Sequence, residues 1–589
     1  MTFKTFADYL SQLEATASRN KITEILADLL KKASGEEIDK ICYLSLGQLA
    51  PLYAGIEFNL ADKLMIRVIS KAFVVPEDKV KREYKKIGDL GEVGAIFNKV
   101  TSGKDFSVLE VFAKLNEIAK ESGSGSVERK IEKMAGLLND LDSLSVRYVI
   151  RVPLGRLRLG FSELTILDAL SWLIAGDKSK RKEIEEAYNV QADIGQIAQI
   201  IKKKGLKGLK TLKIHLGVPI MPALCQRLPN AEGIIKKMCR QNVEHPRSNH
   251  GLGTGGQVAV EPKYDGQRLG VHFAKNRLTR IFTRNLENVT HMFPDIVEAL
   301  GREVKAREVI FDGEAIGFEP KTNKFLPFQE TIKRKRKYEI GEKSKEIPLK
   351  YFAFDILFKD GKDLLNTPFN LRREILVKTI LPDSQIIKLS PQIVTENAQE
   401  LRKFHNEQIK KGLEGVVAKK WEAPYDPGRR GYTWVKLKQE KGKKGGGLAD
   451  TLDCVVMGYY KGRGKRASFG IGGFLVGVRE KEGSDQFMTI SKIGTGLSDE
   501  QWREMRKRID KVKVREKPKE YLIDKNLFPD IWCLPKIVVE IEADNITKSP
   551  IHTAQYALRF PRLVQFRDDK SPEEATTLAE AEKLYKLQR

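Results

Sequence analysis

The sequence predicts a multidomain protein with an all-α N-terminal domain, a mixed α/β middle domain and a C-terminal β-barrel domain. Apolar residues recur at helical spacing up to about residue 215, and short alternating segments typical of strands follow. A run of glycines and lysines at 438–450 then separates a last set of short strands. We therefore expect domains at 1–215, 216–437 and 451–589, with 438–450 as a linker. A chain of 589 residues is long enough for each domain to bury its own core.

The N-terminal region has the amphipathic pattern of helices. In KITEILADLLKKA the apolar residues from Ile22 to Leu30 recur on one helical face. VERKIEKMAGLLNDL and LTILDALSWLIAG contain similar stripes, with short breaks between them. The pattern ends at GVPIMPAL, because its two prolines cannot continue a helix.

The two regions that follow are built on strands. QVAVEPKYD, EVIFDGEAIGF, PLKYFAFDILF, GLEGVVAKKW and YTWVKLK have the β-branched and aromatic content of strands, and LRREILVKTIL between them has a helical pattern. Beyond the linker, TLDCVVMGYY, FGIGGFLVGV, FMTISKIG and KIVVEIEAD are short strands with frequent glycines. Such strands predict a small closed barrel, the shape used by oligonucleotide-binding (OB) folds.

The composition points to a polyanionic partner. Lys and Arg number 104 and Asp and Glu 79, which gives a net charge of +25 and a pI near 9.5. Dispersed cations bind phosphate backbones through counterion release, although an unspecific basic surface would have the same composition. In GRLRLG, Arg156 and Arg158 alternate between glycines, and we expect both to contact nucleic-acid phosphates.

Cysteine usage and hydropathy exclude several classes of protein. The five cysteines are scattered without a CxxC pair, so neither a zinc site nor a disulfide framework is expected. The N-terminus lacks the continuous apolar core of a signal peptide, and the longest apolar run is too short to span a bilayer. We expect a soluble intracellular protein with no membrane partner.

Lys263 is the candidate nucleophile. It ends a strand-like run in VAVEPKYDGQR, just before Asp265 and Gly266, a pair that favours a tight turn. An ordinary solvent-facing lysine would fit the same position. A catalytic amine has to lose its proton, which burial and neighbouring cations such as Arg268 and Arg284 would favour.

Two acidic segments and one basic strand are candidates for binding a metal and phosphates. Asp312 and Glu314 are two apart on a strand and share a face, and Glu414 directly precedes another strand. Carboxylate oxygens are the ligands that Mg²⁺ prefers, although ordinary ion pairs would use the same residues. Lys436 and Lys438 alternate with apolar residues in YTWVKLK, which would let one strand face clamp phosphates.

Taken in order, seven segments resemble the motifs of the covalent nucleotidyltransferase superfamily, and specifically those of the ATP-dependent DNA ligases. They are KYDGQR, TRNLEN, FDGEAI, YFAFDILF, EGVVAKK, WVKLK and RFPRLVQFRDDK. The ordered series is far more specific than any single motif, and the resemblance covers nearly the whole chain. It is closest to the archaeal type of replicative ligase, and it implies a helical DNA-binding domain, an adenylation domain and an OB-fold domain.

The resemblance also implies a role for each matching position. By this resemblance, Lys263 is the nucleophile that takes up AMP. The ATP pocket is lined by Glu261, Arg268, Arg284, Glu314, Phe354, Arg430 and Lys436, and Phe354 stacks on the adenine. Lys438 lies at the phosphates, Glu314 and Glu414 bind a divalent metal, and Arg559 orients pyrophosphate.

The implied activity is the sealing of 5′-phosphate/3′-hydroxyl nicks in duplex DNA through a lysyl-AMP and a DNA-adenylate, in replication, repair and recombination. The implied cofactors are ATP and Mg²⁺, with Mn²⁺ as an alternative metal. Nicked double-stranded DNA is the expected partner, a sliding clamp is a second one that the resemblance allows, and a cytoplasmic, nucleoid-associated monomer is expected. An RNA ligase or capping-type nucleotidyltransferase, an NAD-dependent ligase and a basic DNA-binding scaffold are the alternatives.

Overall fold

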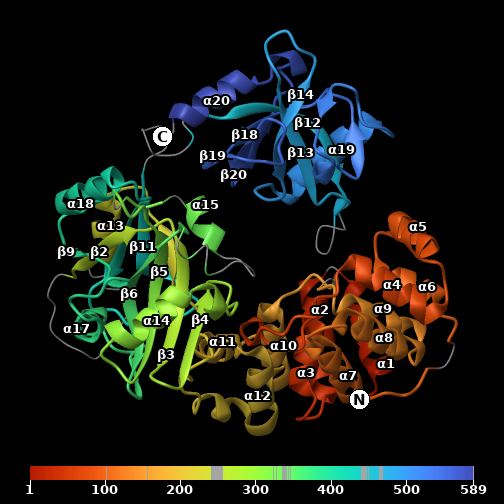
Figure 1. Ribbon diagram of the computed structural model, residues 1–589, viewed down its shortest axis with the longest axis horizontal. Coiled ribbons are helices and arrows are strands. Elements are labelled where there is room, and N and C mark those ends of the chain that lie inside the picture. Colours follow the sequence, from red (N-terminus) through yellow and green to blue (C-terminus); the bar gives the residue numbers. More distant parts are fainter. Residues whose placement is uncertain are drawn as a thin grey trace. The chain divides into compact units, whose positions relative to one another are not determined.

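The computed structural model (Figure 1) describes residues 1–16, 18–100, 103–155, 157–239, 256–322, 324–326, 328–334, 341, 344, 346–439, 448, 450–462 and 469–587. Arg156 and most of the expected linker 438–450 lie outside the described residues. The chain divides into two compact units, one made of Met1–Gln226, Glu232–Leu401 and Val417–Lys436, the other of Arg227–Ala231, Arg402–Val416 and Leu437–Arg589. Over the described ranges, no helix is long and apolar enough to cross a membrane.

The N-terminal part of the first unit is helical, as its apolar periodicity predicts. The α-helices are α1 (Phe3–Glu14), α2 (Arg19–Lys32), α3 (Ile38–Ser45), α4 (Asp62–Phe73), α5 (Glu77–Ile87), α6 (Leu90–Phe97), α7 (Val108–Lys120), α8 (Ser126–Asn139), α9 (Ser143–Arg151), α10 (Glu163–Ala175), α11 (Arg181–Val190) and α12 (Ile194–Leu209). Side chains at several starts accept hydrogen bonds from free backbone N–H groups. Thr2 caps α1 in this way, and Ser107 and Glu110 form a capping box at α7.

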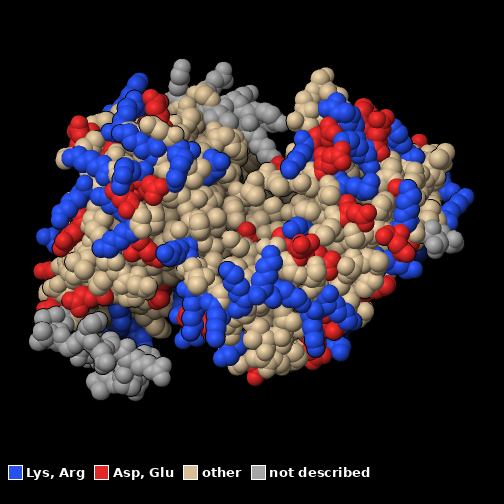
Figure 2. Space-filling model, turned by 90° about the horizontal axis from the view of Figure 1, so that it is seen from below, with Lys and Arg blue, Asp and Glu red and all other residues tan. Residues whose placement is uncertain are grey.

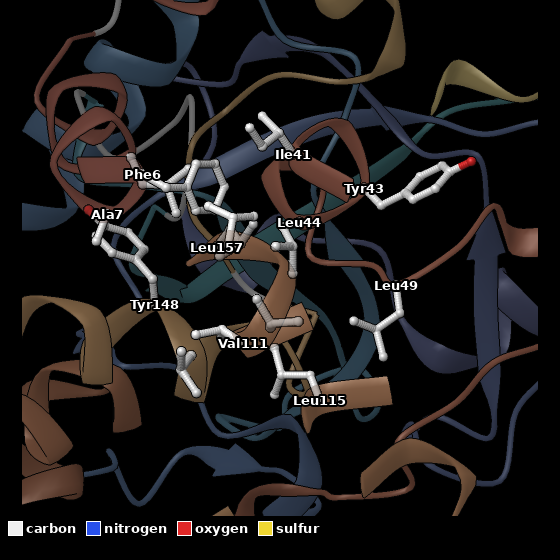
Figure 3. Close-up of a cluster of buried hydrophobic side chains, with 14 of the residues drawn as sticks. Phe6, Ala7, Ile41, Tyr43, Leu44, Leu49, Val111, Leu115, Tyr148 and Leu157 are labelled. Atoms are coloured by element: carbon white, nitrogen blue, oxygen red, sulfur yellow. The ribbon is translucent and has the colours of Figure 1, made fainter. Parts of the chain in front are cut away.

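These helices pack around a continuous apolar core. Figure 3 shows Phe6 of α1, Leu44 of α3, Val111 and Leu115 of α7, and Tyr148 of α9 in one cluster of buried side chains. Each of the five is at most 1% exposed. Full burial of a large apolar side chain contributes roughly 1.5–3 kcal/mol, and helices this short depend on such packing more than on intrinsic propensity.

Two sheets carry the middle of the chain. Their strands are β1 (Leu224–Arg227), β2 (Val258–Lys263), β3 (Gln267–Ala274), β4 (Leu278–Thr283), β5 (Glu308–Gly317), β6 (Leu349–Lys359), β7 (Lys362–Asp363), β8 (Ile387–Leu389), β9 (Ile393–Thr395), β10 (Gly415–Lys420) and β11 (Arg430–Lys438). One sheet has the order β4-β3-β5-β6-β7, with β8 parallel to β6. The other has the order β1-β11-β10-β2-β9.

The middle of the chain also contains helices, two of which pack on the first of these sheets. The helical elements are α13 (Ala231–Met238), α14 (Pro294–Glu303), α15 (Phe328–Thr331), α17 (Phe369–Thr379) and α18 (Ala398–Lys410). Ile296 and Leu300 of α14 and Leu376 of α17 share a core with Leu269 and Val271 of β3. Because side chains alternate along a strand, Arg268, which precedes Leu269 on β3, faces the other way, toward the candidate site.

The C-terminal part of the chain is a sheet-rich half-barrel, in agreement with the predicted OB-type architecture. Its elements are β12 (Leu452–Tyr460), β13 (Gly473–Arg479), β14 (Phe487–Ile493), α19 (Asp499–Lys511), β15 (Lys513–Val514), β16 (Tyr521–Leu522), β17 (Ile531–Cys533), β18 (Val538–Glu542), β19 (Asn545–Lys548), β20 (Tyr556–Arg559), β21 (Arg562–Phe566) and α20 (Leu578–Leu587). α19 buries Trp502, Met505 and Ile509 against this sheet. All five cysteines of the chain are free thiols in this structure.

Candidate functional site

Strand alternation separates an apolar face from a charged face on β3 and β5. Arg268 of β3 lies opposite Glu314 of β5 in the antiparallel pairing, on the face turned away from α14. Burial raises the pKa of the Glu314 carboxyl to about 7; the positive charges of Lys263 and Arg268 oppose that rise and Asp312 adds to it. The fold thus brings Lys263, at the end of β2, close to Arg268 and Glu314. The resemblance to the ligase motifs predicted that these three residues belong to one nucleotide site.

Arg268 is held in a fixed position by its neighbours. Its Nε and Nη2 atoms donate to the two carboxylate oxygens of Asp312 at 2.9 and 2.6 Å, and Nη1 donates to the carbonyl oxygen of Ala223 at 2.6 Å. The Tyr425 hydroxyl donates to the same Asp312 at 2.6 Å. The guanidinium also lies 5.5 Å from the ring centre of Phe354. Two-point pairs of this kind orient the cation as well as binding it.

Glu261 on β2 keeps one carboxylate oxygen free inside a buried cluster. Its side chain is 2% exposed, and Oε2 lies 2.8 Å from the Lys419 ammonium. Oε1 lies 3.6 Å from Nη1 of Arg373 and accepts no hydrogen bond from the described residues. Burial raises the pKa of Glu261, while Lys419 and Arg373 lower it. A buried acceptor without a donor costs about 1–3 kcal/mol, so Oε1 is an oxygen suited to a donor from a ligand.

Phe354 lies at an irregularity in β6. The register with β5 shifts at this point, and Phe354 has no opposite residue on β5. Its half-buried ring packs edge-on against Trp434 at 5.8 Å, with the Lys419 ammonium 4.7 Å from its centre. Phe352, on the other side of the shift, instead stacks on Tyr264 at 4.6 Å. The bulge therefore directs two neighbouring aromatic side chains into different clusters.

The remaining predicted pocket residues of the first unit lie on or directly after strands β4 and β11. Arg284 is exposed just after β4 and lines a pocket with Arg268 and Gly270 on the charged face. Arg430 is exposed at the start of β11. Lys436 is half-buried between buried neighbours, as the alternation in YTWVKLK predicts.

Three predicted residues belong to the second compact unit. Glu414 directly precedes β10 and Lys438 ends β11, and the Lys438 ammonium lies 3.3 Å from Oε2 of Glu414. Arg559 ends β20, with its guanidinium 5.2 Å from the ring centre of Phe560. Within the described ranges no group of three or more His, Cys, Asp or Glu side chains could hold a metal ion. Glu314, the other carboxylate predicted to bind a metal, belongs to the first unit.

Arg158, the described member of the predicted phosphate contacts, also has a structural role. It has a positive φ of 64°, its Nη1 atom lies 3.1 Å from Asp89, and Nη2 donates to the carbonyl oxygen of Gly88 at 2.6 Å. Asp89 in turn accepts from the buried Arg151 at 2.6 Å. The Arg158 side chain remains 27% exposed.

Sequence reasoning missed the residues that hold the site together. Lys419, Arg373 and Tyr425 each contact a predicted pocket residue or its ion-pair partner. For Lys419 a signal existed, because a lysine that follows apolar Val416, Val417 and Ala418 in a strand has to find a buried partner. Nothing local to Arg373 or Tyr425 marks them as neighbours of the site.

Comparison with known proteins gives matches to ligases along almost the whole chain. The family model described as "ATP dependent DNA ligase domain" matches residues 222–438, "DNA ligase N terminus" matches 2–171, and "ATP dependent DNA ligase C terminal region" matches 467–570. The "Probable DNA ligase" of Dictyoglomus thermophilum is 44% identical over 597 residues, which cover 100% of this chain and 98% of that protein.

An archaeal relative and a solved structure extend the comparison. The DNA ligase of Saccharolobus solfataricus is 37% identical over 612 residues, with 100% of this chain and 98% of that protein covered. The solved structure Pmar-Lig_Pre is 18% identical and has a TM-score of 0.54, with 96% of this chain and 99% of that chain covered. At that identity the likeness concerns the fold alone.

Proposed function

This chain belongs to the ATP-dependent DNA ligase family, and from that premise we propose that Lys263 is the residue that takes up AMP. The enzyme joins breaks in duplex DNA at the expense of ATP. The observation that carries the assignment is the electrostatic interaction of Lys263, at the end of β2, with Glu314 of β5, which lies opposite Arg268 of β3. A lysine among buried charges has an environment that an ordinary surface lysine lacks.

The first step forms a bond between the Lys263 nitrogen and the α-phosphorus of ATP. The neutral amine attacks, the bond to pyrophosphate breaks, and AMP remains on the lysine. Arg268, held by Asp312, supplies a fixed positive charge where negative charge accumulates in the transition state. Because this cation is already oriented, it needs no reorganisation when the reaction occurs.

In the next two steps the 5′-phosphate of the nick takes over AMP, and the 3′-hydroxyl then attacks that phosphate and releases AMP. Both DNA ends have to be held in line, and such positioning can contribute roughly 7–11 kcal/mol. We assign Arg156 and Arg158 to holding the phosphate backbone, and Arg559 to orienting pyrophosphate in the first step. The assignment of Arg158 is supported by its partly exposed, positively charged side chain.

We assign recognition of adenine to Glu261 and Phe354. Among the polar groups on the edge of adenine, the exocyclic amine is the hydrogen-bond donor and the ring nitrogens are acceptors. The free Oε1 of Glu261 therefore suits that amine, whereas the 6-oxo group of guanine or hypoxanthine would face it as a second acceptor. Phe354 would stack on the ring system, with Arg284, Arg430, Lys436 and Lys438 near ribose and phosphates.

The metal and the partners complete the proposal. We assign Glu314 and Glu414 to a divalent metal, Mg²⁺ with Mn²⁺ as the alternative, which would offset phosphate charge when bound. We also propose a monomer that works on nucleoid DNA in the cytoplasm. A sliding clamp as a further partner rests on the family alone.

A strand-joining assay tests the function. Nicked DNA and nicked RNA duplexes of the same sequence are incubated with enzyme, a divalent metal and either ATP or NAD⁺. We expect joining of nicked DNA with ATP and at most weak joining in the other three reactions. Preferential joining of nicked RNA would favour the RNA ligase alternative, and joining driven by NAD⁺ would contradict the assignment to ATP.

A further inference from the structure

Helix α17 carries two consecutive buried arginines outside the segments that resemble the family motifs. Arg372 is fully buried, and its Nε and Nη2 atoms donate to Asp355 at 2.7 and 2.9 Å. Asp355 is the residue after Phe354 and is itself fully buried. Arg372 therefore holds the strand segment that presents the Phe354 ring, and it does so from outside the site.

Arg373 reaches the other residue assigned to adenine. Its Nη2 atom donates to the carbonyl oxygen of Ser390 at 2.6 Å, which anchors the guanidinium. Its Nη1 atom donates to none of the described residues and lies 3.6 Å from Oε1 of Glu261. The Arg373 side chain is 10% exposed, so this charge is hardly screened by solvent.

The two oxygens of Glu261 are thus controlled by two different cations. Lys419 contacts Oε2 at 2.8 Å and also donates to the carbonyl oxygen of Phe354 at 2.7 Å, so its position is fixed from two sides. With Lys419 alone, the carboxylate could rotate about its bond and turn both oxygens toward that ammonium. The charge of Arg373 opposes this rotation by attracting Oε1, yet 3.6 Å is too long for the hydrogen bond that would occupy it.

The charges around Glu261 also decide whether Oε1 accepts or donates. Burial raises the pKa of Glu261, Lys419 and Arg373 lower it, and Asp355 on β6 raises it further. A protonated Glu261 would present a hydroxyl in place of an acceptor and would no longer distinguish an amine from an oxo group. Asp355 is neutralised by its pair with Arg372, which leaves Arg373 and Lys419 to keep Glu261 ionised.

We propose that Arg373 is a positioning residue that makes the nucleotide site selective for adenine by holding Oε1 of Glu261 free and aimed at the exocyclic amine. The inference rests on the proposed function, because it takes the base of ATP to lie at Glu261. Arg373 itself contacts no part of the nucleotide in this account; it acts through Glu261.

Single-turnover self-adenylation of the full chain tests the proposal. ATP is compared with inosine triphosphate, in which a 6-oxo group replaces the 6-amino group. We expect Arg373→Met to lower the ratio of kcat/KM for ATP over inosine triphosphate by about tenfold, through a higher KM for ATP at an unchanged maximal rate. Tenfold corresponds to about 1.4 kcal/mol. Arg373→Lys keeps the charge and should restore most of the ratio.

Leu376→Ala is the matched control on the same helix. It opens a cavity in the core that α17 shares with β3 and leaves the charges around Glu261 unchanged, so it should lower the melting temperature and weaken both nucleotides alike, with the ratio unchanged. Equal losses for both nucleotides in Arg373→Met, or a wild-type ratio in it, would overturn the proposal. Should Arg373→Met be too unstable to assay, Arg373→Gln replaces it, with the same two outcomes. Wild-type enzyme that takes up no nucleotide on Lys263 would instead overturn the proposed function.

Discussion

Arg268 and Asp312 form a two-point ion pair in which Nε and Nη2 of the arginine donate to both carboxylate oxygens, at 2.9 and 2.6 Å. The side chains are 16% and 5% exposed, so the pair lies largely out of solvent. Tyr425 donates a third hydrogen bond to the same carboxylate. The pair connects β3 to β5 directly beside Glu314, which links the stability of the sheet to the geometry of the site.

Asp312→Asn should destabilise the first unit and impair adenylation together. The substitution leaves the Arg268 guanidinium without its countercharge, and breaking a buried pair costs roughly 3–5 kcal/mol. Thermal unfolding monitored with and without ATP measures the change. Glu308→Gln on the same strand is the control, because its pair with Arg277 is exposed and should contribute less than about 1 kcal/mol. Similar melting temperatures for the two variants would contradict the structural role of the buried pair.

His272 should make the fold sensitive to acid. Burial lowers the pKa of His272 to about 3, and its Nδ1 accepts from the backbone N–H of Gly217 at 3.2 Å. Between pH 6.5 and about 3 the unfolded chain binds the extra proton, so this stabilisation is complete above pH 6.5 and is lost as the pH falls. Going from pH 7 to pH 5 should cost about 2 kcal/mol.

The comparison for His272 is His272→Asn, which keeps a nearby acceptor that does not titrate. Urea unfolding measures the free energy of unfolding of both proteins at pH 7 and pH 5. We expect the wild type to lose more of it between these two pH values than the variant. The variant should be less stable than the wild type at pH 7, and the difference between them should be smaller at pH 5. An identical pH dependence of the two proteins would mean that His272 does not resist protonation.

Arg158 should contribute to DNA binding through its charge, and to the fold through its contacts with Asp89 and the Gly88 carbonyl oxygen. Arg158→Ala is expected to weaken binding to nicked DNA uniformly across sequences and to reduce the slope of log K against log salt by about 1. Arg158→Lys keeps one charge but cannot span Asp89 and the Gly88 carbonyl, so it should retain the salt slope while lowering the melting temperature. If Arg158→Ala keeps the wild-type slope, the residue serves the fold alone.

Glu414 should set the requirement for a divalent metal. Glu414→Gln removes a carboxylate charge, so the Mg²⁺ concentration for half-maximal self-adenylation should rise by about tenfold, with Lys438 losing its partner at 3.3 Å. Glu298→Gln on α14, which breaks only an exposed ion pair, is the control. A metal titration that superimposes on that of the wild type would remove Glu414 from the site.

The sequence predicted the features that depend on local periodicity. The two-residue repeat of strands places Lys436 and Lys438 on one face, and the burial of Val435 and Leu437 confirms that alternation. Helical stripes predicted the N-terminal helices for the same reason, because their buried faces are encoded within each segment.

Features that depend on contacts between distant segments could not be predicted in this way. The register shift at Phe354 arises from how β6 pairs with β5, and no residue type near it marks the bulge. The approach of Arg373 to Glu261 joins a helix to a strand far away in the sequence, and only the packed fold brings them together. The contacts of Arg158 with Asp89 and Gly88 likewise join segments about 70 residues apart in the sequence.

The basic surface remains consistent with the predicted polyanionic partner. Figure 2 shows Lys and Arg side chains gathered on the face that it presents, interspersed with fewer acidic groups. An excess of 25 positive charges over the chain should make DNA binding steeply dependent on salt.

The covalent step at Lys263 is most directly tested by peptide mass spectrometry of the protein after incubation with ATP and Mg²⁺ in the absence of DNA. The account predicts one added adenylate on the peptide containing Lys263, removed by acid or by pyrophosphate, and none in Lys263→Ala. An unmodified Lys263 peptide from protein that joins nicked DNA, or an adenylate on another residue, would contradict it.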